Sequence, residues 1–124
     1  MFSFQLYNVV HIVGIIFLMA GLGGMALSAG TVASETRSAR RFAMVFHGIG
    51  AFLILLGGFG MLARLGIVQG MSWPGWVWGK AIIWGILGIA VIFPFRFRRT
   101  ALPLMLLLPV LGGLAAYLAI YKPL

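Results

Sequence analysis

The stretch HIVGIIFLMAGLGGM at residues 11–25 decides the fold, and a related stretch, HGIGAFLILLGGFGM, follows at residues 47–61. When the two histidines are aligned, three glycines and a methionine also coincide, 36 positions apart. With 18 glycines in 124 residues, about one shared glycine is expected by chance, so three favour an internal repeat. The histidine, two of the glycines and the methionine of each copy are separated by three, four or seven positions, which predicts that they share one helical face.

Both copies lie in long apolar segments of a chain that is 63% hydrophobic and 8% charged. Each segment is close to the ~20 residues that a helix needs to cross ~30 Å of hydrocarbon. The predicted helices span approximately residues 6–29, 42–63, 76–95 and 101–121. They predict a single transmembrane domain over residues 1–124, an all-α bundle of four helices in up-down-up-down order. The first segment follows no basic region and precedes no clear cleavage site, so it is interpreted as a retained helix.

The net charge of +8 is concentrated in two predicted connections. Arginines occur between the first two helices and between the last two: Arg37, Arg40, Arg41, Arg96, Arg98 and Arg99. The positive-inside rule then places both termini on the non-cytoplasmic side. These charges suit anionic lipid headgroups, so the bilayer is the expected partner and nucleic acid is not. The polar residues 34–38 are predicted to form a loop, and the absence of cysteine excludes disulfides, thiolate metal sites and iron–sulfur clusters.

Each repeated face combines a histidine with a row of glycines. The faces consist of His11, Gly14 and Gly21 in the first helix and His47, Gly50 and Gly57 in the second. Missing side chains either let another helix approach closely or leave room for a flat ligand such as a porphyrin. An imidazole is costly inside a bilayer, so both histidines are predicted to act as ligands or proton carriers, with an interhelical hydrogen bond as the alternative.

Helical rise sets the expected depth of these groups. With 1.5 Å per residue and antiparallel helices, His11 and His47 lie about 20 Å apart along the membrane normal, so one haem iron cannot bind both. The same arithmetic puts His11 level with Met61, and His47 level with Met25. Imidazole and thioether are suitable axial ligands of haem iron and suitable ligands of Cu(I), whereas methionine is also a common filler of apolar cores.

Lys80 is predicted to lie near the depth of His11, about one turn into the third helix. Trp76 and Trp84 are four residues before and after it, on the same helical face. Lys80 either extends its stem to the interface or faces the bundle, where it could bind a propionate or transfer protons. Tyr7 and Asn8 could complete a polar cluster there. The leucine-rich fourth helix is expected to pack and to carry no chemistry.

Three features together resemble small haem-associated membrane proteins with four helices. They are a histidine early in the first helix, the segment ETRSARR at residues 35–41, and the segment WVWGK at residues 76–80. The chain is most similar to the membrane-type protoporphyrinogen oxidases and the copper-resistance D-like proteins. The first resemblance implies b-type haem and oxidation of a porphyrinogen in the bacterial inner membrane, with His11 and Lys80 as the positions that carry over.

Three functional hypotheses follow. The first is a redox protein, and an oxidoreductase if it is an enzyme, that holds b-type haem near His11 with Lys80 as charge partner and has a possible second haem near His47. The second is a Cu(I)-binding membrane protein that uses the histidines and the methionines level with them. The third is a noncatalytic subunit of a larger membrane complex, or a homo-oligomer, in which the glycine rows serve helix docking.

Overall fold

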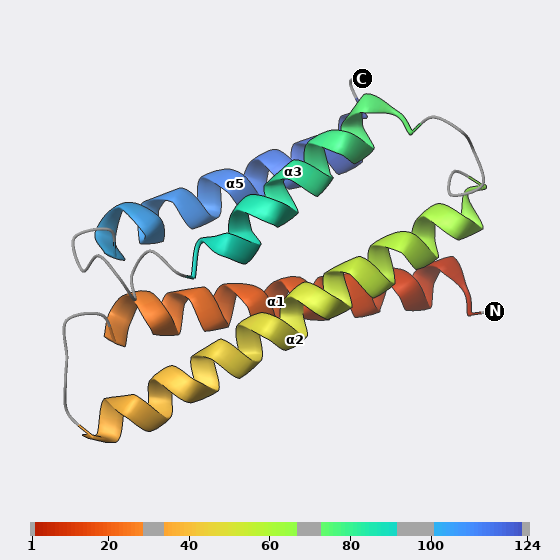
Figure 1. Cartoon of the computed structure of the whole chain (residues 1–124). Coiled ribbons are helices and arrows are strands. Elements are labelled where there is room, and N and C mark those ends of the chain that lie inside the picture. Colours follow the sequence, from red (N-terminus) through yellow and green to blue (C-terminus); the bar gives the residue numbers. More distant parts are fainter. Residues whose placement is uncertain (1, 29–33, 67–72, 92–100, 123–124) are drawn as a thin grey trace.

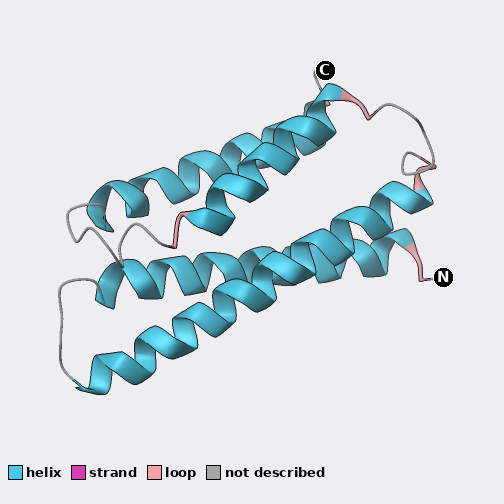
Figure 2. Cartoon of the chain, in the orientation of Figure 1, coloured by secondary structure: helices cyan, strands magenta, loops and turns pink. Residues whose placement is uncertain are grey.

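The computed structural model describes residues 2–28, 34–66, 73–91 and 101–122. The described residues form helices, with a few turn and loop residues at the helix ends and no strand among them (Figure 2). The helices are α1 (Phe4–Ser28), α2 (Ser34–Arg64), α3 (Gly75–Ile89) and α5 (Ala101–Tyr121), as labelled in Figure 1. The prediction of an all-α chain with four helices is therefore confirmed for the described residues.

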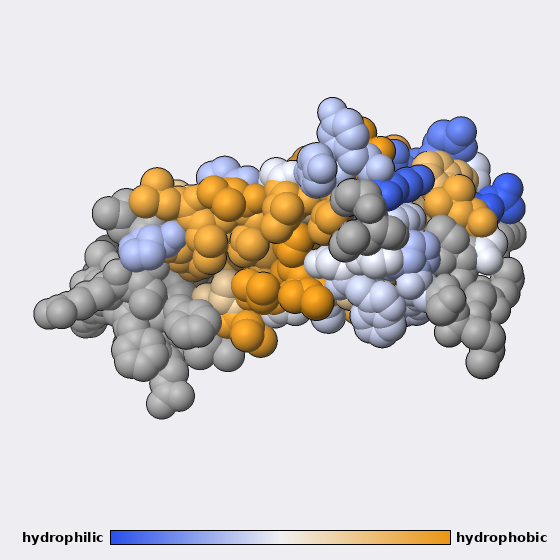
Figure 3. Space-filling model, turned by 90° about the horizontal axis from the view of Figure 1, so that it is seen from above, coloured by the Kyte–Doolittle hydropathy of each residue, from blue (hydrophilic) through white to orange (hydrophobic). Residues whose placement is uncertain are grey.

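Three helices are long and apolar enough to span a membrane. The stretches that qualify are Phe4–Ala26, Arg40–Arg64 and Pro103–Tyr121, whereas α3, with 15 residues, is a shorter apolar helix. Large hydrophobic side chains on these helices face outward, and Figure 3 shows hydrophobic residues covering the middle of one face with hydrophilic residues gathered toward one end. Such a surface suits contact with lipid and indicates a membrane protein.

The observed helix bounds differ from the predicted ones at two places. α2 begins at Ser34, so the polar residues 34–38, predicted as a loop, form the first turns of a helix. No glycine or proline occurs between residues 34 and 41, so nothing in this segment breaks the helix, and α2 extends beyond its apolar stretch. The described part of α3 ends at Ile89, and residues 92–95 of its predicted range lie outside the described residues.

Glycine brings α1 and α2 into backbone contact. A Cβ added at Gly14 would lie 2.7 Å from the backbone nitrogen of Ile54 and 2.9 Å from the carbonyl oxygen of Gly50. A Cβ added at Gly50 would lie 2.6 Å from the carbonyl oxygen of Gly14 and 2.7 Å from the Cα of Leu18. Real Cβ atoms do not approach other atoms this closely, so only glycine allows the two helices to cross here.

The repeat has a structural counterpart on both sides of this crossing. His11 of α1 lies against Gly57 of α2, and His47 of α2 lies against Gly21 of α1. The pattern continues outward, because Tyr7 contacts Gly60 and Ala43 contacts Gly24, residues that are again 36 positions apart. These pairs make α1 and α2 antiparallel, with Gly14 and Gly50 at the centre of an approximate twofold arrangement.

The glycine faces therefore accommodate a helix. Gly14, Gly21, Gly50 and Gly57 were predicted to line a cofactor groove or to pack a helix, and in the structure the partner helix fills the space beside all four. The physical reason is that the two faces are complementary, each offering a histidine where the other offers a glycine. In the structure these four glycines pack against the partner helix, which occupies the space beside them.

The second layer of the fold is formed by α3 and α5, which lie next to each other across the α1–α2 pair (Figure 1). The most completely buried side chains, Leu18, Leu22 and Met25, all belong to α1. Side chains from all four helices join this core, including Ala43, Ile83 and Leu108. Against this packed region, the other half of the bundle contains a cavity.

Candidate functional site

A cavity of about 630 Å³ lies among all four helices. Its walls are mainly apolar, and the side chains that bring polar atoms to it include Asn8, His11, Lys80 and Lys122. Three tryptophans, Trp73, Trp76 and Trp84, also line it. A largely apolar cavity of this size with a few polar groups is typical of a small-molecule or cofactor site, for which volumes of roughly 300–1,000 Å³ are usual.

His11 is held in the wall of this cavity by the backbone of α2. Its side chain is buried, and its Nδ1 lies 2.9 Å from the carbonyl oxygen of Ile54. A carbonyl oxygen only accepts hydrogen bonds, so Nδ1 carries the proton and donates it, which leaves the lone pair on Nε2. Within the described parts of the chain, Ile54 is the hydrogen-bond partner of this ring. Nε2 is therefore available to a molecule in the cavity.

Two neighbouring glycines of α2 determine where the His11 ring can lie. A Cβ on Gly57 would come within 2.5 Å of the His11 backbone nitrogen and 2.6 Å of the Tyr7 carbonyl oxygen, so Gly57 sets the distance between the helices. A Cβ on Gly58 would lie 3.5 Å from Cε1 and Nδ1 of the ring, an ordinary contact. The imidazole thus rests against a flat stretch of α2 without side chains, within reach of the Ile54 carbonyl.

Lys80 and His11 line the same cavity, as their predicted depths require. Lys80 is partly buried, and it lies within electrostatic range of His11. Trp76 and Trp84 line the cavity with it, so the predicted shared face of α3 points inward. Lys80 thus lies on the bundle-facing side of α3, and its role toward a propionate or in proton transfer stays a prediction.

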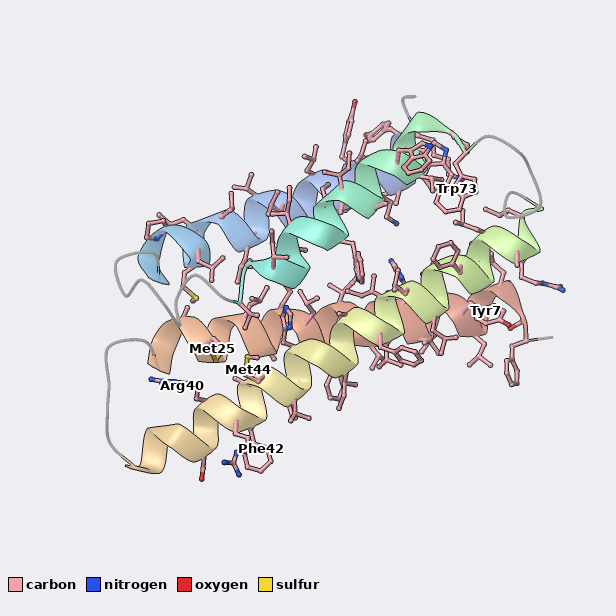
Figure 4. The ribbon with its side chains drawn as sticks, viewed as in Figure 1. Tyr7, Met25, Arg40, Phe42, Met44 and Trp73 are labelled. Atoms are coloured by element: carbon pink, nitrogen blue, oxygen red, sulfur yellow. The ribbon has the colours of Figure 1, made fainter. Side chains whose placement is uncertain are left out.

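Trp84 also joins α3 to α2. Its indole Nε1–H donates a hydrogen bond of 3.1 Å to the carbonyl oxygen of Ala51. In the cavity wall the rings of Phe59 and Trp73 lie 5.7 Å apart, and on its outer side Trp73 lies 5.1 Å from the exposed ring of Trp78. Figure 4 labels Trp73 near the start of α3, opposite the end of α2. These aromatic side chains give the cavity rigid, flat walls.

His47 has different surroundings. It is buried, its Nε2 lies 3.1 Å from the carbonyl oxygen of Leu87 in α3, and it is not among the residues that line the cavity. Because the carbonyl accepts, Nε2–H is the donor. His47 and His11 lie on opposite sides of the Gly14–Gly50 crossing, which agrees with the expectation that one iron cannot bind both. The interhelical hydrogen bond considered as the alternative for these histidines is present at both, from His11 to α2 and from His47 to α3.

The two methionines are also separated by the fold. Met61 lines the cavity with His11, whereas Met25 is buried in the core beside Leu18 and Leu22. Figure 4 labels Met25 toward the end of α1, where α2 begins. Among the described residues there is no group of three or more histidine, cysteine, aspartate or glutamate side chains that could hold a metal ion. The structure therefore brings together only the first of the two predicted histidine–methionine half-sites at a cavity.

Tyr7 and Asn8 do not form one polar cluster. Asn8 lines the cavity, but the Tyr7 ring packs on Gly60 and meets Phe2 edge-on, with ring centroids 6.1 Å apart. The prediction for Tyr7 is wrong because neighbouring helical positions point about 100° apart, and only one of the two can face the cavity.

Sequence reasoning missed the part of the site that α5 contributes. This helix was expected to carry no chemistry, yet its small residues Gly112, Ala115, Ala116 and Ala119 form one wall of the cavity. Their helical spacing was the available signal. Lys122, at the end of the same helix, also lines the cavity, and its Nζ lies 5.1 Å from the centre of the Trp76 ring.

Comparisons with known proteins add no family. No protein-family model, no curated protein and no solved structure matches the chain. The resemblance to haem-associated membrane proteins therefore stays a prediction, and the site has to be interpreted from its own geometry.

Proposed function

We propose that the chain is an up-down-up-down four-helix bundle of the bacterial inner membrane, with both termini on the non-cytoplasmic side. The antiparallel α1–α2 pair supports this topology, and so does Figure 1, in which the start of α1 and the end of α5 lie toward the same end of the bundle. The arginines of the sequence support the orientation, because basic residues are retained in the cytoplasm: Arg37, Arg40 and Arg41 lie in the first turns of α2, and Arg96, Arg98 and Arg99 lie outside the described residues, between α3 and α5. The cavity then lies in the outer half of the membrane.

The lack of native cysteine makes this orientation directly testable. Ser38→Cys and Leu65→Cys place single thiols at exposed positions at opposite ends of α2. In cells with a permeable outer membrane, we expect an impermeant maleimide to label Leu65→Cys, and to label Ser38→Cys only after the inner membrane is opened. The reverse pattern would invert the topology.

We propose that the cavity binds b-type haem, with Nε2 of His11 as the axial ligand. The observation that carries this proposal is the hydrogen bond from His11 Nδ1–H to the Ile54 carbonyl oxygen. Histidines that bind metals usually donate their other ring N–H to a carboxylate, a backbone carbonyl or water, which fixes the tautomer and the ring orientation. His11 has this arrangement while its Nε2 remains free of protein partners among the described residues.

The rest of the cavity suits the same group. Its volume lies in the range of cofactor sites, its tryptophans and alanines provide apolar walls for a flat macrocycle, and Lys80 provides a positive charge for a propionate. When bound, b-type haem supplies one-electron transfer, the basis of a redox or porphyrinogen-oxidising role. The chain itself supplies the axial nitrogen, the charge of Lys80 and the exclusion of water.

The test is a reduced-minus-oxidised absorption spectrum of the protein purified in mild detergent from haem-replete cells. We expect a haem spectrum from the wild type, its loss in His11→Ala and its retention in His47→Ala. His47→Ala is the matched control, because it removes a buried imidazole of the same repeat away from the cavity. A flat wild-type spectrum would overturn the proposal and favour a noncatalytic subunit, which should tolerate both substitutions.

A Cu(I) site is the second candidate, because His11 and Met61 line one cavity. It predicts that Met61→Leu and His11→Ala both lower the copper content of the purified protein. Met25→Leu, which alters a methionine in the core, should leave the copper content unchanged. If haem is the ligand, Met61→Leu leaves the absorption spectrum in place.

A further inference from the structure

Two lysines from different parts of the chain line the same cavity. Lys80 comes from α3 and Lys122 follows the last turn of α5, and both line the cavity. The two ammonium groups are close enough to repel each other. Positive charges that share a largely apolar site are unfavourable unless a negative group compensates them.

The position of Lys122 is defined by the fold. Its backbone has a φ of 49°, which is uncommon for a residue with a side chain, and its N–H donates a hydrogen bond of 3.1 Å to the Leu118 carbonyl oxygen. The side chain places Nζ 5.1 Å from the centre of the Trp76 ring. This cation–π contact holds the ammonium group of α5 over α3 at the mouth of the cavity.

The chain has no acidic side chain at this end to compensate the two lysines. Its single carboxylate residue is Glu35, in the first turn of α2, whereas the cavity is reached by the C-terminal half of that helix. The one acidic side chain of the sequence therefore does not compensate these lysines, whereas an acidic group of a ligand in the cavity would reach both.

We infer that Lys80, Lys122 and Trp76 form an anion subsite, and that the cavity selects an apolar ligand carrying two acidic groups on one edge over its neutral counterpart. This inference rests on the proposed function for the nature of the ligand, since b-type haem and protoporphyrinogen each carry two propionates. It adds a specificity-determining role for Lys122 and Trp76.

The test uses metal-free protoporphyrin, whose fluorescence reports binding without any axial ligand, and its dimethyl ester, which has the same apolar body without the acids. In neutral detergent we expect the wild type to bind the diacid about tenfold or more tightly than the diester. A hydrogen bond to a charged group is strong enough to give a difference in affinity of this size. Lys122→Met should remove most of this preference, and Lys80→Met should do the same. Lys122 lies at a helix end, so its variant tests the subsite without altering the core.

Arg64→Met is the matched control. It removes one positive charge near the same end of the bundle, from a residue that does not line the cavity, and we expect it to retain the preference for the diacid. Equal affinities of the wild type for diacid and diester would overturn the inference, and so would an equal loss in Arg64→Met. Displacement of the diacid by equimolar phosphatidylglycerol, whose headgroup carries one charge, would overturn the selection for two acids.

The two proposals fail separately. The porphyrin titration does not depend on iron or on His11, so a flat haem spectrum with a retained preference for the diacid would overturn haem binding alone. Conversely, a haem spectrum that depends on His11, together with equal binding of haem and its dimethyl ester, would overturn the anion subsite alone.

Discussion

The two ends of the α1–α2 pair share one local arrangement and differ in what covers them. At each end a histidine of one helix lies against a glycine of the other, His11 on Gly57 and His47 on Gly21. At the first end the His11 imidazole hydrogen-bonds to the backbone of α2 and lines a cavity. At the second end the His47 imidazole hydrogen-bonds to the backbone of α3 and is enclosed. The comparison teaches that the repeat determines how α1 and α2 cross, and that α3 and α5 determine what each histidine can do.

The position of α3 accounts for this difference. Two hydrogen bonds in opposite directions join it to α2, one donated by His47 to Leu87 and one donated by Trp84 to Ala51. Both lie on the His47 side of the cavity, and Trp84 and Leu87 contribute to its lining. The paired bonds close one end of the space between the layers, and the cavity occupies the other end.

The largest expected effect breaks the feature that both ends share, the helix crossing. In Gly50→Ala the new methyl group meets the Leu18 backbone and the Gly14 carbonyl, so we expect a loss of about 1–3 kcal/mol in the free energy of unfolding, measured by thermal or denaturant unfolding in detergent. Gly48→Ala is the control two residues away, because nothing lies within 4 Å of its added Cβ. Equal destabilisation by both substitutions would contradict the role assigned to the crossing.

A smaller effect is expected from breaking the enclosed end alone. His47→Ala leaves the Leu87 carbonyl without its imidazole partner, which should lower the free energy of unfolding by about 1–1.5 kcal/mol. Haem or porphyrin affinity should change little, because His47 does not line the cavity. His47→Gln keeps a side-chain N–H donor and should recover part of the stability. Loss of the ligand in a folded His47→Ala protein would show that the two ends are not separate.

Trp84→Phe weakens the second bond between α2 and α3 while keeping an aromatic ring in the cavity wall. Removing the Nε1–H donor to Ala51 should cost about 1 kcal/mol, detectable as a lower unfolding midpoint. The double variant with His47→Ala should change the free energy of unfolding by an amount that differs from the sum of the two single changes, because both hydrogen bonds join the same two helices. Strictly additive effects would indicate that the bonds act independently.

Much of this arrangement follows from local patterns in the sequence. Apolar length predicted the helices, the spacing of Gly14 and Gly50 predicted a face able to pack, and helical rise brought Lys80 level with His11. The start of α2 was missed because polar residues without a helix breaker were taken for a loop. The partner of His47 and the place of Lys122 depend on where α3 and α5 lie, which no spacing within one helix reports.

The smallest expected effect sharpens the comparison at His11 itself, where two adjacent glycines have different roles. A Cβ at Gly57 meets backbone atoms of α1, but a Cβ at Gly58 lies 3.5 Å from Cε1 and Nδ1 of His11, an ordinary contact. Gly58→Ala should therefore leave the free energy of unfolding unchanged or raise it by up to about 1 kcal/mol, because alanine favours the helix. Gly57→Ala should destabilise the protein clearly in the same unfolding measurement.

Because the Gly58 methyl would touch the ring that Ile54 orients, a folded Gly58→Ala protein with a shifted haem spectrum would tie the ring position to the ligand. Equal destabilisation by the two alanines would instead mean that the ring has no free space beside α2.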